Sequence, residues 1–257
     1  MDRIDLNCDM GESFGAWKMG SDEEMLKIVT SANIACGFHG GDPLVMFETV
    51  ARAKELGVGV GAHPGFLDIW GFGRRAFQGE KPDDIMKMVV YQLGALGGVA
   101  RALGYPLRHV KPHGALQNLA AADRAVALAV GRAIAAFDPS LIYLAQAGTE
   151  LERAAAELGL PLAREIYADR AYAEDGTLLS RRLPGALIHD ADEAARRVLA
   201  MVREGAVITQ SGKRIPVAID TVCVHGDNPA AVTMAARVRE ALEGAGIAVR
   251  PMVSGRA

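Results

Sequence analysis

Short apolar segments alternate with longer segments of helical periodicity along almost the whole chain. The short segments are rich in apolar and β-branched residues, and we expect strands at 4–8, 31–36, 58–62, 109–111, 141–144, 163–167, 222–224 and, near the end, 247–252. Between them the pattern predicts helices at 22–29, 44–56, 82–103, 121–137, 148–158, 190–204 and 229–245. Gly57 and Gly104 follow two of these helices, and Asp190 and Asn228 stand at N-cap positions of two others.

This alternation predicts parallel strands covered by helices, because right-handed crossovers place all strand carboxyl ends on one side. Seven or eight such units in about 250 residues favour a closed or nearly closed (β/α) barrel over an open doubly wound sheet. No linker or repeat interrupts the pattern, so we expect residues 1–257 to form a single catalytic domain. Residues 172–184 are polar and rich in turn formers, and we interpret them as a long loop that acts as a lid.

Composition narrows the functional classes. Half of the residues are hydrophobic and the net charge is −3, with no basic stripe of the kind that binds nucleic acid or an anionic membrane. The longest apolar runs are strand-sized, and the acidic N-terminus lacks the apolar core of a signal peptide. The three cysteines lack C-x-x-C spacing, so we expect reduced thiols in the cytoplasm, with Cys8 and Cys36 as small buried residues.

Four of the six histidines follow predicted strands and stand beside glycine or proline: His39, His63, His113 and His225. In a parallel α/β fold, the residues just beyond the strand carboxyl ends share one cleft. A lone histidine in such a turn is usually a polar loop residue or a core residue, but four in equivalent turns indicate an active site. His109 begins its strand and His189 precedes a helix, so we expect both to be structural.

Other polar side chains fall in the same positions. Asp9 follows the first strand and is a candidate general base, metal ligand or orienting group for a histidine. Lys111 lies in an apolar strand and needs a carboxylate partner or a ligand; it could polarise a carbonyl. Arg74 and Arg75 follow a Gly-Phe-Gly turn and suit a carboxylate or phosphate, although one of them is expected to form a surface ion pair. Asp42 precedes a proline and a helix, so an N-cap role and a functional role stay equally open.

These positions give two sets of candidates. The catalytic candidates are Asp9, His39, His63, Lys111 and His113. The substrate-binding candidates are Asn7, Glu12, Asn33, Asp42, Arg74, Arg75, Asp169, Arg170, His225 and Asp227. The sequence contains no G-x-x-x-x-G-K-[ST], G-x-S-x-G or H-E-x-x-H motif, which argues against a Walker-type ATPase, a serine α/β-hydrolase and a zincin protease.

Seven sequence blocks, in order along the chain, resemble one known family. They are LNCDMGESFG at 6–15, NIACGFHGGDP at 33–43, GAHPGF at 61–66, GFGRR at 71–75, VKPHGAL at 110–116, YADRAY at 167–172 and VHGDNP at 224–229. Together they are similar to the LamB/YcsF family, and the match extends to about residue 245. Gly40 stands where the family often has alanine, and Gln117 where an aromatic residue is common. Neither departure affects a histidine, aspartate or arginine of the blocks.

The resemblance implies a seven-stranded barrel of the glycoside hydrolase/deacetylase type. It also implies the A component of a prokaryotic ATP-dependent 5-oxoprolinase, which opens the lactam of 5-oxo-L-proline to L-glutamate together with subunits B and C. ATP would then bind to a partner or at a shared interface. In such a site we expect Arg74 or Arg75 to bind the substrate carboxylate and Lys111 to bind the lactam oxygen. Asp9, with His39, His63 or His113, would activate water.

Two other functions stay open. The first is a metal-dependent amidohydrolase or deacetylase that acts alone, in which a divalent ion would bind to Asp9, His39, His63 and His113. The second is a non-catalytic subunit that binds the lactam while its partners carry out the chemistry. Metal analysis followed by chelation distinguishes the metal-dependent enzyme from the 5-oxoprolinase component. Calorimetric titration of the isolated chain with 5-oxoproline tests the non-catalytic binding role.

Overall fold

Seven parallel strands close into a barrel in the computed structural model, which describes residues 2–75, 79–226 and 229–252. Hydrogen bonds join the strands in the order β1, β2, β3, β4, β5, β6, β9, and β9 pairs back to β1. The predicted barrel is therefore confirmed. The strands are β1 (Arg3–Met10), β2 (Ser31–Ala35), β3 (Gly59–His63), β4 (Leu107–Val110), β5 (Ile142–Gln146), β6 (Leu162–Tyr167) and β9 (Thr221–Val224).

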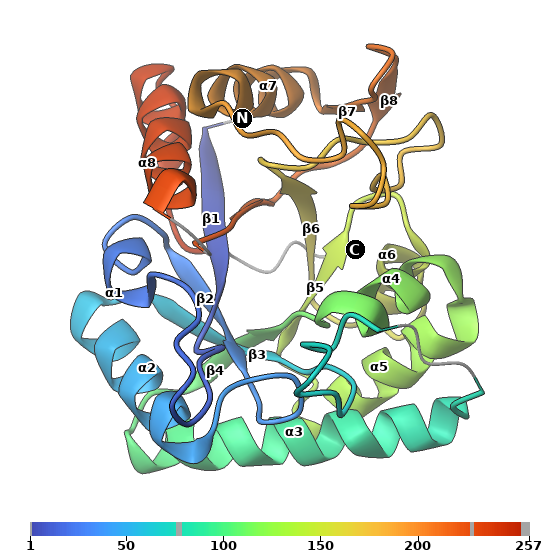
Figure 1. The fold of residues 1–257 in the computed structure, drawn as a ribbon. Helices are drawn as coiled ribbons and strands as arrows, with labels where there is room; N and C mark the ends of the chain where they lie inside the picture. Colours follow the sequence, from blue (N-terminus) through green and yellow to red (C-terminus); the bar gives the residue numbers. More distant parts are fainter. Residues whose placement is uncertain (1, 76–78, 227–228, 253–257) are drawn as a thin grey trace.

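Helices surround the strands (Figure 1), and α3 and α5 pack against each other, as do α7 and α8. The described helices are α1 (Asp22–Met25), α2 (Pro43–Leu56), α3 (Pro82–Ala102), α4 (Gly114–Ala122), α5 (Arg124–Phe137), α6 (Glu150–Glu157), α7 (Ala191–Glu204) and α8 (Pro229–Gly244). Among the residues that the structure describes, no helix is both long and apolar enough to cross a membrane.

One predicted helix, at 121–137, is wrong at its start. The chain forms α4 directly after His113, and Asp123 then ends α4 and caps α5 by accepting hydrogen bonds from the N–H groups of Ala125 and Val126. A capping aspartate satisfies N–H groups that have no partner within the helix, so a new helix begins there. Asp190 caps α7 in the same way, as predicted, while Asn228 lies outside the described residues.

The remaining strands lie outside the closed ring. β10 (Ala248–Val249) extends the sheet beside the start of β1. β7 (Ala206–Ile208) and β8 (Arg214–Pro216) form an antiparallel hairpin that the sequence pattern did not predict. The segment 172–184 begins at the fully buried Tyr172, whose backbone carbonyl accepts a hydrogen bond from the N–H of Gln210 next to this hairpin. The predicted long loop is thus anchored at its start, and its role as a lid stays a prediction.

The interior of the barrel is polar while the layer between strands and helices is apolar. Along β1, apolar Ile4, Leu6 and Cys8 alternate with Asp5 and Asn7, and all of them are buried. Side chains of a strand point alternately to its two faces, so one set packs against the helices and the other fills the barrel. A polar interior is stable here because its groups are hydrogen-bonded to one another, and this network supports the site at the carboxyl ends of the strands.

Candidate active site

The candidate residues converge at the carboxyl ends of the strands. Their positions are Asp9 near the end of β1, His39 in the turn after β2, His63 at the end of β3, His113 just before α4 and His225 just after β9. Asp9 lies between the histidines, with its Oδ2 atom 3.4 Å from His63 Nε2 and 3.9 Å from His225 Nε2. The structure therefore brings together the four histidines that the strand-end argument selected.

Three histidines and Glu12 form a compact cluster. The rings of His39 and His113 stack with centroids 3.6 Å apart, and His63 Nε2 lies 3.0 Å from His113 Nδ1. Glu12 Oε1 lies 3.0 Å from His39 Nε2 and 3.3 Å from His113 Nδ1. Glu12, which we expected to bind substrate, thus occupies the place among the three histidines that we expected Asp9 to occupy.

Backbone carbonyls fix the protons on two of these rings. His63 Nδ1 lies 2.7 Å from the carbonyl oxygen of Lys111, and His113 Nε2 lies 2.8 Å from that of Phe72. A carbonyl oxygen only accepts hydrogen bonds, so each of these nitrogens carries a proton. Burial, reinforced by neighbouring histidines, lowers the pKa of His39 and of His113 well below the usual value, which favours their neutral forms.

Lys111 lies beneath this cluster with its charge fully buried. Its Nζ atom lies 3.0 Å from Asp9 Oδ1, 2.8 Å from Glu165 Oε1 and 3.3 Å from Asn7 Oδ1. Burial alone would raise the pKa of Asp9, but its contacts with His63 and with the ammonium of Lys111 outweigh it and hold that pKa well below its usual range. The three hydrogen bonds of the Lys111 ammonium go to Asp9, Asn7 and Cys223, and Glu165 adds an ion pair, so the donors of Lys111 are used inside the barrel.

Two asparagines hold Asp9 from the inside of the barrel. Asn33 Nδ2 donates to Asp9 Oδ1 over 2.9 Å and to Asn7 Oδ1 over 2.8 Å. His109 Nε2 donates to Asn33 Oδ1 over 2.7 Å, which fixes the orientation of the Asn33 amide. Asn7 and Asn33, which were substrate-binding candidates, therefore position Asp9, and His109 has the structural role that we expected.

His225 and Asp169 form a histidine–carboxylate pair. Asp169 Oδ2 accepts a hydrogen bond from His225 Nδ1 over 2.8 Å, which leaves His225 Nε2 facing Asp9. Burial alone would lower the pKa of His225, but the charge of Asp169 outweighs it and raises that pKa. The side chains of His225 and Asp9 remain 13% and 14% exposed, so both are in contact with solvent.

The two neighbouring arginines differ in their surroundings. Arg75 forms a hydrogen-bonded ion pair with the buried Asp68, so it is the surface pair that we expected of one of the two. The guanidinium of Arg74 lies 4.9 Å from the centre of the Phe72 ring, next to the turn whose carbonyl binds His113. Arg74 is therefore the better placed of the two for a ligand carboxylate.

Comparison with known proteins identifies the family. The family model described as "LamB/YcsF family" matches residues 4–257. This chain belongs to the LamB/YcsF family. A relative from Ruegeria pomeroyi, named as the A component of 5-oxoprolinase, is 55% identical over 249 residues, covering 97% of this chain and 98% of that protein. The crystal structure of the lactam utilization protein from Thermus thermophilus superposes with a TM-score of 0.92 at 48% identity, over 97% of this chain and 100% of the other.

The fold is shared more widely than the family. A family 4 carbohydrate esterase from Streptomyces lividans matches with a TM-score of 0.51 at 10% identity, over 96% of this chain and 91% of the other. This likeness shows the deacetylase-like barrel that the resemblance implied, and at that identity it shows the fold alone.

Two of the remaining candidates have other roles in the LamB/YcsF chain. Asp42 accepts hydrogen bonds from the N–H groups of Leu44 and Val45, so the N-cap interpretation is the one that the structure shows. Arg170 is buried and donates to the carbonyl of Leu179, which ties the 172–184 segment to the barrel. Asp227 lies outside the described residues.

Glycines allow the turns to approach the histidines. A Cβ atom at Gly65 would lie 2.9 Å from His39 Nδ1, and one at Gly73 would lie 2.8 Å from His39 Cβ and 2.9 Å from His113 Cδ2. Gly73 also adopts a φ of +62°, which side chains other than glycine rarely tolerate. The stacked pair of histidines therefore depends on both glycines.

The sequence argument missed Glu165, Tyr167 and Cys223. All three contact Lys111: Glu165 by its ion pair, Tyr167 with its ring centre 5.4 Å from Nζ, and Cys223 with Sγ 3.2 Å from Nζ. They lie within strands, whereas the argument considered mainly residues just beyond strand ends. A carboxylate within a predicted barrel strand was the available signal for Glu165, because a buried carboxylate requires a partner.

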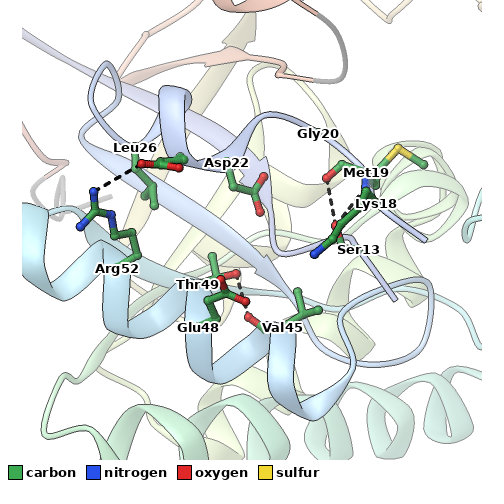
Figure 2. A pocket seen from close by; sticks show the side chains of 11 residues that line it. Ser13, Lys18, Met19, Gly20, Asp22, Leu26, Val45, Glu48, Thr49 and Arg52 are labelled. Atoms are coloured by element: carbon green, nitrogen blue, oxygen red, sulfur yellow. Dashed lines mark hydrogen bonds and ion pairs between the residues drawn. The ribbon is translucent and has the colours of Figure 1, made fainter. Parts of the chain in front are cut away.

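A separate cavity of about 260 Å³ lies between the segment 13–26 and α2 (Figure 2). None of the cluster histidines lines it. Burial raises the pKa of Asp22 in its wall to about 6. Asp22 Oδ2 accepts a hydrogen bond from the N–H of Gly11 over 2.8 Å, so this wall supports the turn that carries Glu12.

Proposed function

We propose that this chain is the lactam-opening component of an ATP-dependent 5-oxoprolinase, which converts 5-oxo-L-proline to L-glutamate. The observation that carries the proposal is the Asp169–His225 pair facing Asp9 at the accessible part of the site. A histidine that donates one ring proton to a carboxylate is a well-formed general base at its other nitrogen. The names of the relatives, which refer to 5-oxoprolinase and to lactam utilization, support a cyclic amide as the substrate.

Coupling to ATP follows from the chemistry of the substrate. The amide of a five-membered lactam is stabilised by resonance, and water attacks it slowly. Phosphorylation of its carbonyl oxygen would produce a much better electrophile and a good leaving group. Because the sequence has no phosphate-binding loop of the Walker type, we assign ATP binding to partner subunits, B and C, or to an interface with them.

In the proposed reaction His225 removes a proton from water. Its Nε2 atom faces Asp9 Oδ2 at 3.9 Å, so a water molecule beside the pair could form hydrogen bonds to both atoms. Water held there would donate one proton to His225 and a hydrogen bond to Asp9 while its oxygen bonds to the carbonyl carbon of the phosphorylated lactam. The proton on His225 would then pass to the ring nitrogen as the C–N bond breaks, and a second water would hydrolyse the resulting acyl phosphate to glutamate and phosphate. Lys111 keeps Asp9 ionised for this purpose, because its ammonium lies 3.0 Å from the carboxylate.

Arg74 is the proposed partner of the substrate carboxylate. It is exposed at the rim of the site, and Gly73 and Phe72 place it beside His113. A guanidinium binds a carboxylate through two parallel hydrogen bonds, which would orient the lactam toward His225.

Exposed apolar side chains near the same end of the barrel support contact with a partner protein. Trp70, Leu44 and Trp17 are 92%, 81% and 64% exposed. One backbone hydrogen bond joins the Trp70 loop to the His39 turn, and the side chain of Asp42 at the start of α2 accepts a hydrogen bond from the Trp17 turn, so these segments are neighbours. Tryptophan is enriched at interfaces between proteins, and we assign this rim to contact with one of the subunits B and C.

Reconstitution tests the proposal. Purified chain, subunits B and C, ATP and 5-oxo-L-proline are combined, glutamate is measured, and each component is then omitted in turn. We expect glutamate only from the complete mixture. Glutamate formation at an undiminished rate without this chain would contradict the proposal, and so would full activity of a complex that contains the His225→Ala variant. Full activity of that variant, together with tight 5-oxoproline binding by this chain, would favour a non-catalytic binding role.

A further inference from the structure

Three atoms of the histidine cluster face one small space. His63 Nε2 lies 3.0 Å from His113 Nδ1, and Glu12 Oε1 lies 3.3 Å from His113 Nδ1 and 3.9 Å from His63 Nε2. The outer nitrogens of both rings donate to backbone carbonyls, so in neutral rings the inner nitrogens carry lone pairs. Two lone pairs at 3.0 Å repel each other unless a proton or a metal cation lies between them.

We propose that His63, His113 and Glu12 bind a divalent transition-metal ion, with zinc as the best fit. A triangle with the three measured sides has its centre about 2.0 Å from each corner, and zinc binds histidine nitrogen and carboxylate oxygen at about 2.0–2.2 Å. Two histidines and a glutamate are a donor set of catalytic zinc sites, which leave a further position open for water or substrate. Imidazole and carboxylate together also suit cobalt and related ions.

The hydrogen bonds around the three ligands resemble the outer shell of a metal site. The carbonyls of Lys111 and Phe72 fix the tautomers of His63 and His113 so that each presents a lone pair to the shared space. His39 acts as a positioning residue. Its Nδ1 atom is buried with no hydrogen-bond partner among the described residues, so its proton is best placed on Nε2, from which it donates to Glu12 over 3.0 Å.

The neighbouring group of Asp9, Cys223 and His225 is a poorer site for a cation. Lys111 Nζ already lies 3.0 Å from Asp9 Oδ1 and 3.2 Å from Cys223 Sγ. A metal ion there would be repelled by this buried ammonium. We therefore place the ion on Glu12 rather than on Asp9, although the sequence had suggested Asp9 as a ligand.

The proposed site goes beyond the lactam reaction, because it depends only on the geometry of these side chains. A divalent ion in this position supplies Lewis-acid polarisation of an oxygen ligand or a bound water of lowered pKa. The Glu12 side chain is 13% exposed, so the proposed site is in contact with solvent.

Metal titration of the untagged full-length chain tests the proposal. The protein is stripped with a chelator, and binding of Zn²⁺ alone is followed by calorimetry, with Co²⁺ absorption as a second readout. We expect one ion per chain and no sulfur-to-cobalt charge-transfer band. Glu12→Gln and His113→Ala should weaken binding more than about 100-fold, while His39→Asn should weaken it about 10–100-fold, the usual cost of losing an outer-shell partner. His189→Ala, at an exposed histidine, is the control and should bind normally.

Absence of Zn²⁺ binding to the stripped chain would overturn the proposal and assign the 3.0 Å contact to a shared proton. Equal Zn²⁺ affinity of the wild type and Glu12→Gln would also overturn it. Glu12→Gln differs little in shape, so it keeps the test valid even if His113→Ala does not fold, which circular dichroism would show. The titration contains no ATP, substrate or partner, so its outcome is separate from that of glutamate formation.

Discussion

Replacement of Asp169 by asparagine should shift the pH dependence of lactam opening in a defined direction. The His225 imidazole acts as a base only when it is neutral, and the carboxylate 2.8 Å away raises its pKa above the ordinary value of 6.5. In the wild type, kcat/KM should therefore fall as the pH is lowered through a value above 6.5. In Asp169→Asn the attraction is removed, so the pKa of His225 decreases and the acid limb moves to lower pH.

The size of the shift follows from the charge that is removed. Two unit charges about 4 Å apart interact by about 4 kcal/mol at an effective dielectric constant of about 20, which corresponds to about 3 pKa units. Because the pair is partly exposed to water, we expect about 1–2 units. The weaker base and the less strongly held ring should also lower kcat/KM at its plateau about 10-fold, below the roughly 10²–10⁴-fold contribution of an entire general base.

The assay is glutamate formation by the reconstituted complex, with kcat/KM measured from acidic to alkaline pH. His189→Gln, at an exposed histidine, is the matched control and should leave the profile unchanged. If the acid limb of Asp169→Asn coincides with that of the wild type, His225 is not the base that Asp169 controls, and the reasoning is refuted.

Three further predictions concern stability and assembly. Lys111→Met should lower the free energy of unfolding by about 3–5 kcal/mol in urea titration, because the buried carboxylates lose their partner. Adding Glu165→Gln should recover part of this loss. An unchanged free energy of unfolding in Lys111→Met would contradict the buried network. Gly61→Ala should destabilise the chain by about 1–3 kcal/mol, because its Cβ would lie 2.2 Å from a buried histidine ring. Gly94→Ala, in open space on α3, should be neutral or stabilising. Equal melting temperatures of the two variants would refute this expectation. Trp70→Ser should leave the melting temperature unchanged but weaken association with subunits B and C at least about 10-fold in sedimentation experiments, and unchanged association would exclude this rim as the interface.

The sequence was most informative where one physical rule governs many residues. Alternation of strands and helices predicted the barrel, and the rule that parallel strands end at one side predicted that His39, His63, His113 and His225 share one site. The structural role expected for His109 also follows from that rule, since it stands inside its strand and bonds to Asn33.

The features that the sequence did not predict depend on which residues meet in space rather than on their order along the chain. Glu165 reaches Lys111 across the barrel interior, and no local pattern states which charged residues of distant strands meet. Asp9 and Glu12 are three positions apart and chemically alike, so only the structure shows that Lys111 holds the first while the histidines surround the second. The β7–β8 hairpin was missed because its strands are only three residues long.

The most direct test of the proposed function is the rate of glutamate formation by a complex that contains the His225→Ala variant of this chain. With subunits B and C, ATP and saturating 5-oxo-L-proline, we predict a loss of about 10²–10⁴-fold relative to the wild type, while circular dichroism and association with the partners stay unchanged. A variant complex that forms glutamate at the wild-type rate would contradict the claim that the cluster at the strand ends opens the lactam.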